Sequence, residues 1–596
     1  MKSKNPETAM TMMRTVKFST LLFLFLLLSG LRAGPLDFGG GSADTRFMDR
    51  ATAALEKRVR GYPGVDRLYR ELFYTPVWIG KKAPTPFART LLRRIEGDRT
   101  VPPMLKLRED ARRLSGELRS LYASDASLRQ KIEMELALSR LYLNYMHYLL
   151  YGGIDWPAFQ AKLKELAQKY DAKVGWDYYR PKMTPASLLV EATMQGDLSA
   201  AFRKAEPTRF RYAALKRELV RYLDIAARGG WKPVPAFKSI RPGQKHPAVP
   251  RIREHLRIEG DLRECETPED PQLYDACLER AVKRFKLRHG LKGTPVIDRR
   301  TRHWLNVPVE RKILLMRLNL DRIKWLWRDE APIRIELNIP SFRLYFYEGK
   351  HLVDTMRVIV GKPNHPTPSF HNVMKYIVVN PYWKIPESIV KQEMLKHLIR
   401  DPYYYERRGK ILKRSWDEDS ERVDPGTVDW AKYRAKNKHI PYYFMQVPGT
   451  SNALGKIKFL FPNGYSVYIH DTPTKKLFFR NERAFSHGCM RIQKPRELLK
   501  VLALYNDNID VEAIMARLGT REKKTIALKR RVPVDITYLT AYIDPYGNLN
   551  FRKDIYHYDK YQLEHYAYNP ALKRTEQGEN TADTASGGSA KGRKKE

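Results

Sequence analysis

Apolar residues at helical spacing dominate roughly the first 245 positions. In "SLRQKIEMELALSRLYLNYMHYLLYGG" apolar side chains recur every three or four residues, and Gly152 and Gly153 are typical of a helix end. The segments "DRLYRELFYTPVW" and "PFARTLLRRIEG" repeat the pattern. We therefore expect a helical scaffold domain at residues 34–245. Its stripe of Tyr and Leu is typical of a core, and no pattern in it indicates chemistry.

A segment rich in Pro and Gly, "VPAFKSIRPGQKHPAVPR", follows these helices and predicts a linker. Residues 250–308 then predict a unit of short helices and a turn. One connecting helix is predicted at residues 309–330, which include the segment "RKILLMRLNLDRIKWLW".

The period of the pattern changes to two near residue 331. Ile333, Ile335 and Leu337 alternate with polar residues, and "EGK" supplies a hairpin turn. These features predict a β-rich domain over residues 331–520, because alternate side chains of a strand point to opposite faces and only one face is buried.

Two further segments complete this pattern. Residues 384–445 are polar, basic and helix-like, which predicts an insertion between strands. Residues 521–560 alternate again and predict strands that pack on the β-rich domain. The tail 569–596 is small and polar, a composition typical of disorder. The fold class expected is multidomain α+β.

The N-terminal 33 residues have the layout of an export signal. Four basic residues precede the apolar run Leu21–Leu28, and small residues follow near Gly30 and Ala33. The run is shorter than the roughly 20 residues that span a membrane. We expect a signal peptide at residues 1–33, with an uncleaved anchor as the alternative, and a location in the periplasm or cell envelope.

The charge of the chain indicates an acidic partner. Lys and Arg number 109 against 67 Asp and Glu, a net charge of +42. Nucleic acid, an anionic membrane surface and an acidic wall polymer all fit such a balance. Export argues against nucleic acid and leaves the wall or the membrane surface. A basic face that is merely solvated is the alternative.

The chain has three cysteines. Cys265 and Cys277 are close in sequence and are candidates for a disulfide in an exported protein, with two reduced thiols as the alternative. Cys489 would then be unpaired, which is a liability in an oxidising compartment unless the thiol has a function.

The sequence around this thiol, "AFSHGCMRI", offers the groups that a nucleophile needs. His470 or His487 could take the thiol proton, and Arg491 adds positive charge that favours a thiolate. Gly488 lets main-chain N–H groups approach an oxyanion. A metal site is disfavoured, because no second cysteine is near and His487 and Cys489 are only two residues apart. These spacings predict a cysteine acyltransferase or hydrolase.

The same residues resemble the signature of L,D-transpeptidases. His470 is followed after fifteen residues by Ser486, His487, Gly488 and Cys489. Arg491 stands where many members have Asn, and Arg is common in enzymes of Gram-negative type. The stretches "NIPSFRLYFY", "RVIVGKPNHPTPSF", "VVNPYWKIPESI" and "VPVDITYLTAYID" also resemble the large periplasmic members, which have a helical scaffold and a lid-like insertion.

Residues 250–308 resemble the peptidoglycan-binding module of wall enzymes. The matching residues are Ala281, Val282, Phe285, His289, Gly290, Leu291, Val296, Ile297, Thr301, Leu305 and Asn306. Lys286 and Asp298 stand where that family usually has Gln and Gly. The resemblance implies the fold, and these departures leave a purely structural spacer as the alternative to glycan binding.

The family resemblance implies roles for the site residues. Cys489 is the implied nucleophile and His470 the general base and acid. Ser486, His487 and Gly488 shape the site, and the amides of Gly488 and Cys489 are the implied oxyanion donors. Arg491 would orient the loop or a substrate carboxylate.

The implied reaction joins two peptidoglycan stem peptides. A donor tetrapeptide loses D-Ala to form a thioester, and the side-chain amine of an acceptor stem then gives a 3–3 cross-link. No metal or cofactor is needed, carbapenems acylate the same cysteine, and other wall-synthesis proteins are candidate partners. The alternatives are an L,D-carboxypeptidase or hydrolase, a lipoprotein-to-wall transpeptidase, and a wall-binding scaffold with a vestigial site.

Overall fold

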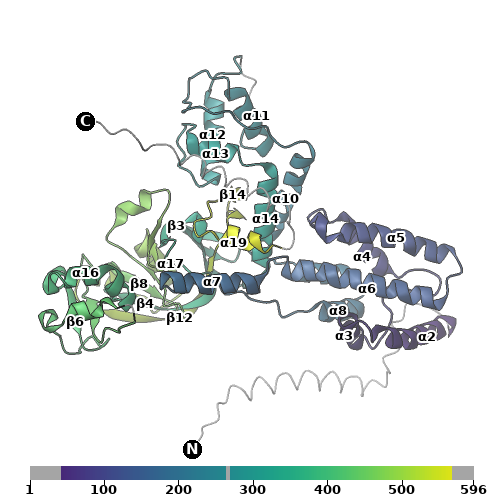
Figure 1. The fold of residues 1–596 in the computed structure, drawn as a ribbon, viewed down its shortest axis with the longest axis horizontal. Coiled ribbons are helices and arrows are strands. Elements are labelled where there is room, and N and C mark those ends of the chain that lie inside the picture. Colours follow the sequence, from purple (N-terminus) through teal and green to yellow (C-terminus); the bar gives the residue numbers. More distant parts are fainter. Residues whose placement is uncertain (1–41, 264–268, 436, 567–596) are drawn as a thin grey trace, which may run out of the picture. The chain divides into compact units, whose positions relative to one another are not determined.

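The computed structural model describes residues 42–263, 269–435 and 437–566 in two compact units (Figure 1). The helical unit comprises the described residues up to Leu150 and residues 182–206. The sheet unit comprises residues 151–181 and the described residues from 207 onward. The predicted signal, the predicted tail and Cys265 lie outside the described residues.

The helical unit consists of packed helices, as the periodicity predicts. Glu135 is completely buried on its longest helix, and its carboxylate accepts hydrogen bonds from the main-chain N–H groups of Val77, Trp78 and Ile79. Burial raises the pKa of Glu135 to about 7. The helices are α2 (Ser42–Val59), α3 (Pro63–Glu71), α4 (Pro86–Gly97), α5 (Leu107–Ala123), α6 (Leu128–Tyr151), α8 (Pro185–Gln195) and α9 (Leu198–Ala205).

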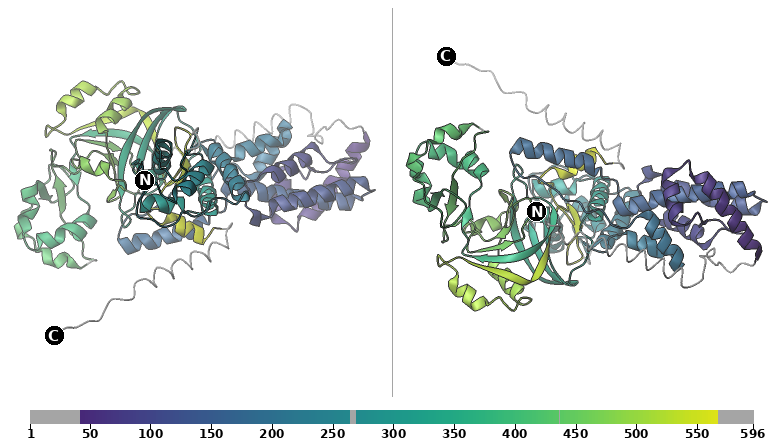
Figure 2. Two further views of the ribbon diagram at one scale, coloured as in Figure 1. Left: turned by 90° about the horizontal axis from the view of Figure 1, so that it is seen from above. Right: turned by 90° about the horizontal axis from the view of Figure 1, so that it is seen from below.

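The predicted scaffold of residues 34–245 is divided between the two units, which corrects its boundary. Helix α7 (Trp156–Tyr170) contacts α19 (Tyr558–Glu564), and both are visible side by side in Figure 2. Helix α10 (Tyr212–Ala227) packs against α14 (Val309–Lys324) in a common apolar core. The apolar faces of α7 and α10 are therefore buried inside the sheet unit. Helical periodicity predicts that a face is buried but not which neighbour covers it.

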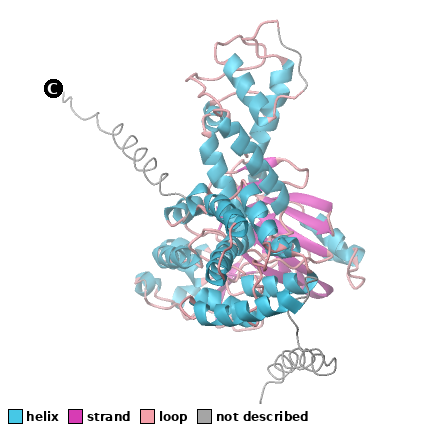
Figure 3. Ribbon diagram, turned by 90° about the vertical axis from the view of Figure 1, so that its right-hand side faces the viewer, coloured by secondary structure: helices cyan, strands magenta, loops and turns pink. Residues whose placement is uncertain are grey.

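Nine strands of the sheet unit form one sheet in the order β10-β3-β11-β9-β8-β4-β12-β1-β2 (strands are magenta in Figure 3). β2 also pairs with β3, because the first half of the long β3 faces β2 and its second half faces β11. This pairing connects β2, at one end of the order, to β3, which is next to the other end, so β2 is not a free edge. The first strands are β1 (Ile333–Asn338), β2 (Arg343–Glu348), β3 (His351–Gly361) and β4 (Phe370–Val379). The later strands are β8 (Ile457–Leu460), β9 (Ile469–His470), β10 (Ala484–Ser486), β11 (Met490–Ile492) and β12 (Lys524–Thr537).

The position of β12 corrects a second prediction. The sequence predicts that residues 521–560 pack on the β-rich domain, but β12 lies inside the sheet, antiparallel to β4 and parallel to β1. Only the hairpin of β13 (Ala541–Ile543) and β14 (Leu549–Phe551) packs outside, against α10 and α14. The order of strands in space is a tertiary property that alternation does not specify. Helices α17 (Pro495–Ala503) and α18 (Val511–Arg517) precede β12.

A small module follows α10 and has its own core. It contains α11 (Val249–Glu259), α12 (Ala276–Arg288) and α13 (Arg299–Leu305). The predicted linker is part of this core, because Val234, Ile240 and Ala248 are buried in it. Ile240 also forms a β-bridge with Ile297. We call residues 234–305 the small module.

The insertion, residues 384–445, also has an apolar core of its own. Its first part is helical, as predicted: α15 (Glu387–Ile389), the π-helix η3 (Val390–Met394) and α16 (Leu395–Leu398). The remainder differs from the helical prediction. It holds a three-stranded sheet of β5 (Trp383–Lys384), β7 (Tyr443–Gln446) and β6 (Lys410–Lys413), with short 3-10 turns between the strands.

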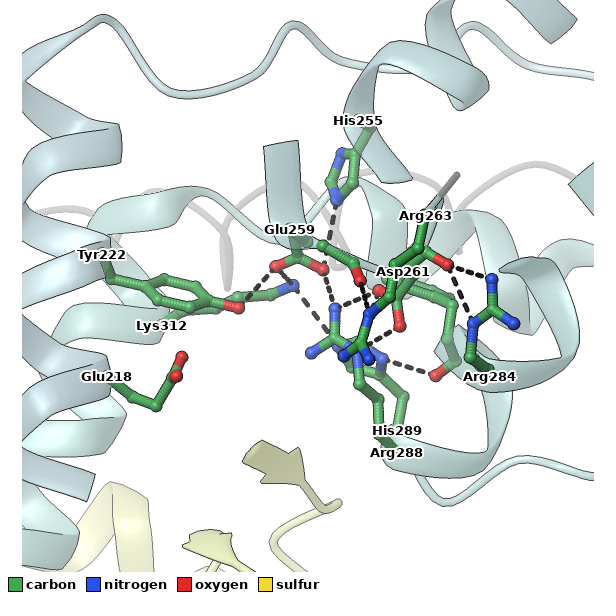
Figure 4. Close-up of polar contacts among 12 residues, drawn as sticks. Glu218, Tyr222, His255, Glu259, Asp261, Arg263, Arg284, Arg288, His289 and Lys312 are labelled. Atoms are coloured by element: carbon green, nitrogen blue, oxygen red, sulfur yellow. Dashed lines mark hydrogen bonds and ion pairs between the residues drawn. The ribbon is translucent and has the colours of Figure 1, made fainter. Parts of the chain in front are cut away.

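Buried ion pairs fix the small module to the helices of the sheet unit (Figure 4). Glu259 on α11 is fully buried and contacts both Lys312 of α14 and Arg288 of α12. It also accepts a hydrogen bond of 2.9 Å from the hydroxyl of Tyr222 on α10. Burial would raise the pKa of Glu259, but Arg288 and Lys312 hold it well below its ordinary value. The carboxylate therefore stays charged and joins four helices.

Within residues 42–566, less the gaps at 264–268 and 436, no helix is both long and apolar enough to cross a membrane. The export signal remains a prediction, since it lies outside this range.

Replacing Glu259 by Gln tests the structural role of these ion pairs. We expect the local unfolding free energy of α11, α12 and α14 to fall by about 3–5 kcal/mol, because the Lys312 ammonium stays buried without a carboxylate. Hydrogen exchange of the full chain, read peptide by peptide, measures this change. The control is Glu279→Gln, which removes a partly exposed pair with Lys283 on α12 and should cost less than about 1 kcal/mol. Equal exchange in both variants would contradict the role.

Candidate active site

The candidate site is built on the parallel pairing of β9 with β11. Met490 lies opposite Ile469, and Arg491 lies opposite His470. Side chains alternate along a strand, so Cys489, two residues before Arg491, faces the same side of the sheet as His470. The sheet register thus makes Cys489 and His470 diagonal neighbours on one face.

A tight turn between β10 and β11 presents the cysteine. Gly488 has φ +106, a backbone conformation that L side chains rarely adopt. The hydroxyl of Ser486 donates to the carbonyl of Cys489 at 2.5 Å, and that of Thr367 donates to the carbonyl of Gly488 at 2.7 Å. The main-chain N–H groups of Gly488 and Cys489 have no acceptor among the described residues. They are therefore free to donate to a ligand.

These residues line a pocket of about 470 Å³. One wall is the strand and turn region with Tyr468, His470, Ser486, His487, Gly488, Cys489 and Arg491. The insertion contributes a second wall, which includes Pro386, Ile389, Glu393 and Trp416. The segment after α7 contributes Asp171, Ala172 and Lys173. This last contribution corrects the prediction that residues 34–245 bring nothing to the chemistry.

Burial controls the charge of the central pair. Burial raises the pKa of the Cys489 thiol above its ordinary value, although hydrogen bonding by Tyr468 and the charges of Lys458 and Arg491 oppose it. Burial and the charges of Arg491 and Lys458 lower the pKa of His470 to about 3. The positive charges of Lys458 and Arg491 favour the thiolate, as the sequence predicts, but the effect of burial on the pKa is larger. At neutral pH the site holds a neutral thiol beside a neutral imidazole.

His470 has an unused ring nitrogen. The side chain is 3% exposed, and its Nδ1 is a buried atom with no hydrogen-bond partner in the described part of the chain. A buried polar atom without a partner is costly, and at a functional site it marks a group kept available for a ligand or a proton. His470 is thus equipped to accept a proton.

His487 has a different environment. Its Nε2 lies 2.7 Å from Oε1 of Glu393 in the π-helix of the insertion, and Lys362 lies 3.3 Å from the same oxygen. His365, whose ring centroid is 4.8 Å from that of His487, contacts the neighbouring Gln392 at 3.0 Å. Two consecutive side chains of the π-helix, Gln392 and Glu393, thus contact His365 and His487. His487 therefore connects the turn to the insertion.

Sequence reasoning missed two residues beside the thiol. Tyr468 lies two residues before His470 and faces the same side of β9. Lys458 lies opposite His470 on β8, with its Nζ 3.8 Å from the centre of the Tyr468 ring. Burial lowers the pKa of Lys458 to about 8. The alternation of side chains in "KIKFLF" and "YSVYIH" could have assigned Lys458 and Tyr468 each to one face of its strand. Only the pairing of β8 with β9 shows that the two side chains lie close together.

The structure gathers the six predicted site residues at this one pocket and places the disulfide candidates elsewhere. Cys277 lies on α12 of the small module, and Cys265 lies outside the described residues, so their disulfide stays a prediction. In the described part of the chain, no three His, Cys, Asp or Glu side chains gather in a way that could hold a metal ion.

Two family models match the chain. Residues 332–534 match the L,D-transpeptidase catalytic domain named YkuD, and residues 63–219 match a model described as a scaffold domain. The first match begins beside β1 and ends inside β12. It therefore covers the strands that carry Cys489 and His470.

A Haemophilus influenzae protein named "Putative L,D-transpeptidase" is 34% identical over 227 residues. The matched stretch covers 38% of this chain and 44% of the relative, so the likeness spans less than half of either protein.

Solved structures of L,D-transpeptidases share only low similarity with the whole chain. The one from Stackebrandtia nassauensis aligns with 51% of this chain and 96% of its own, at 12% identity and a TM-score of 0.21. The one from Mycobacterium smegmatis aligns with 35% of this chain and 59% of its own, at 11% identity and a TM-score of 0.16. Scores this low carry no argument, and the domain assignment rests on the sequence match of residues 332–534. Residues 332–534 of the chain therefore carry the L,D-transpeptidase catalytic domain named YkuD.

Proposed function

We propose that the protein forms 3–3 cross-links between peptidoglycan stem peptides through a thioester on Cys489. The observation that carries the proposal is the position of Cys489 beside a neutral His470 on one face of the sheet, in a pocket with unengaged N–H donors. A nucleophile, a base and oxyanion donors at one place are the requirements of acyl transfer.

The first half-reaction forms the thioester. Sγ of Cys489 attacks the carbonyl between the third residue of the donor tetrapeptide and its terminal D-Ala, while His470 takes the thiol proton. The N–H groups of Gly488 and Cys489 donate to the developing oxyanion. The C–N bond then breaks, and His470 returns the proton to the departing D-Ala amine.

The second half-reaction transfers the acyl group. The side-chain amine of the third residue of an acceptor stem attacks the thioester and loses a proton to His470. The C–S bond breaks, and Cys489 leaves with that proton as a thiol. Because the resting pair is neutral, each step moves one proton and leaves no net charge in the buried site.

Arg491 is proposed to hold a substrate carboxylate. It lines the pocket, and its Nε is a buried atom without a hydrogen-bond partner among the described residues. A guanidinium with an open donor is suited to a carboxylate, which stem peptides carry. The competing role of Arg491 is bracing of the turn.

The insertion is proposed to act as a lid. Its side chains line the pocket, and Glu393 connects it to His487 of the catalytic turn. Acyl transfer to an amine succeeds only where water is kept from the thioester. Water that reached the thioester would give the L,D-carboxypeptidase reaction instead.

The proposed setting is the periplasm or cell envelope, with donor and acceptor stem peptides as partners. The support is the predicted export signal and the net charge of +42, which suits an anionic wall or membrane surface.

Incubation with disaccharide tetrapeptide tests the central proposal. Mass spectrometry should detect 3–3 dimers and released D-Ala. Cys489→Ala should reduce turnover by on the order of 10³-fold or more, and His470→Gln by about 10²–10⁴-fold. A carbapenem should add its mass to Cys489 in the parent protein and not in Cys489→Ala. Full activity of Cys489→Ala, or products confined to hydrolysis, would contradict the proposal.

The pH dependence of thiol alkylation tests the neutral pair. Because burial raises the pKa of Cys489 and lowers that of His470 to about 3, iodoacetamide should react slowly at pH 6–7 and steadily faster as the pH rises above about 9. The rate is followed on the peptide that contains Cys489. A thiolate–imidazolium pair would instead give an inflection below pH 7 and fast alkylation at neutral pH, which would refute this charge state.

Glu393→Gln tests the lid. Loss of the carboxylate weakens the contacts with His487 and Lys362. The ratio of hydrolysed tripeptide to cross-linked dimer should therefore rise by about 2–5-fold, because such an ion pair contributes up to about 1 kcal/mol. Glu421→Gln is the matched control, since it removes an exposed pair with Arg414 elsewhere in the insertion. A variant that lacks residues 384–445 should show a larger rise, and an unchanged ratio in it would eliminate the lid role.

A further inference from the structure

A second, larger cleft lies between the small module and the sheet. Its volume is about 900 Å³, and it shares no lining residue with the pocket of Cys489. The module contributes the end of α12, the following turn and α13, and the sheet contributes β2, β3 and the segment that leads into β10. We call this space the arginine cleft.

The charge of the arginine cleft is strongly one-sided. Nine Lys and Arg side chains line it against one carboxylate, that of Glu482. Lys553 already contacts Glu482 at 3.1 Å, and within the described residues none of the other eight makes an ion pair with a carboxylate. The nine are Lys292, Arg299, Arg300, Arg343, Arg357, Arg480, Arg483, Arg552 and Lys553.

Four arginines that line the cleft, Arg343, Arg357, Arg483 and Arg552, have no carboxylate partner among the described residues, and the charges of the other three act on Arg483. Arg483 is 9% exposed and donates only to main-chain carbonyls, among them that of Phe342 at 3.1 Å. Burial, together with the charges of Arg357, Arg343 and Arg552, lowers the pKa of Arg483 to about 9. Like charges held together in a partly desolvated space destabilise the fold, unless an anion binds between them.

Aromatic side chains accompany these charges. Phe479 is 66% exposed, with the guanidinium carbon of Arg357 at 5.8 Å from its ring centre. Trp304 of α13 lines the cleft from the module side. An exposed apolar ring at the edge of a charged cleft offers a flat surface for the C–H face of a sugar.

We propose that the arginine cleft binds a phosphate-bearing saccharide. Phosphate concentrates up to two negative charges and several acceptor oxygens at one point, which suits a cleft lined by nine cations and one carboxylate better than the single, separated carboxylates of a stem peptide. The exposed ring of Phe479 and the Trp304 side chain supply the contact surface for the sugar. The site is independent of the proposed reaction, because Cys489 and His470 lie in the other pocket.

Calorimetric titration of the full chain tests the site, with glucosamine 1-phosphate as the probe. N-acetylglucosamine and glucuronic acid are the neutral and carboxylate comparisons. We expect saturable binding of the sugar phosphate, at least 10-fold tighter than of either comparison, and weakening as salt is raised.

The variant Arg343→Gln/Arg480→Gln removes two exposed charges from the cleft and should weaken binding of the sugar phosphate at least 10-fold. The control Arg521→Gln/Arg531→Gln removes two exposed charges outside the cleft and should leave binding within 2-fold. Circular dichroism checks that each variant is folded, and Cys489→Ala should bind as the parent does. Absence of saturable binding, equal losses in the control, or equally tight binding of glucuronic acid would overturn the proposal.

Discussion

The chemistry of this protein depends on one short parallel strand pair, β9 with β11. Each strand has only two or three residues, yet their register sets Cys489 beside Tyr468 and Arg491 beside His470. A shift by one residue would turn the thiol or the imidazole to the other face of the sheet. The neighbouring strands hold this register, since β11 also pairs with β3 and β9 with β8. The closed order of the larger sheet is thus what keeps a two-residue strand in place.

The same register explains the unusual charge state of the site. Lys458, His470 and Arg491 lie in one row across β8, β9 and β11. Two cations flank a buried imidazole, so protonation of His470 is opposed both by burial and by like charge. Positive charge beside a cysteine is usually taken to favour the thiolate. Here the desolvation of Cys489 outweighs that effect, and the cations act mainly on the histidine.

Two groups of charged side chains around the small module differ in whether their charges are neutralised within the protein. At Glu259, opposite charges are fully buried and each finds its partner, which fixes the module on α10 and α14. In the arginine cleft, nine positive side chains line one space, and eight of them have no carboxylate partner in the described structure. The first arrangement is complete without a ligand. The second is stabilised only when an anion enters.

The sequence by itself determined the α+β class, the β-rich domain from near residue 331, the insertion, and the candidates Cys489, His470 and their neighbours, because periodicity and short motifs are local properties of the chain. It did not determine that residues 234–251 belong to a core, that β12 lies inside the larger sheet, or that the insertion contains a three-stranded sheet. It also left Tyr468, Lys458 and the segment after α7 out of the site. These depend on which distant strands and helices bury their faces against one another, and burial in turn sets the pKa of Cys489 and His470. Long-range packing is therefore what decided the geometry and the charge of the site.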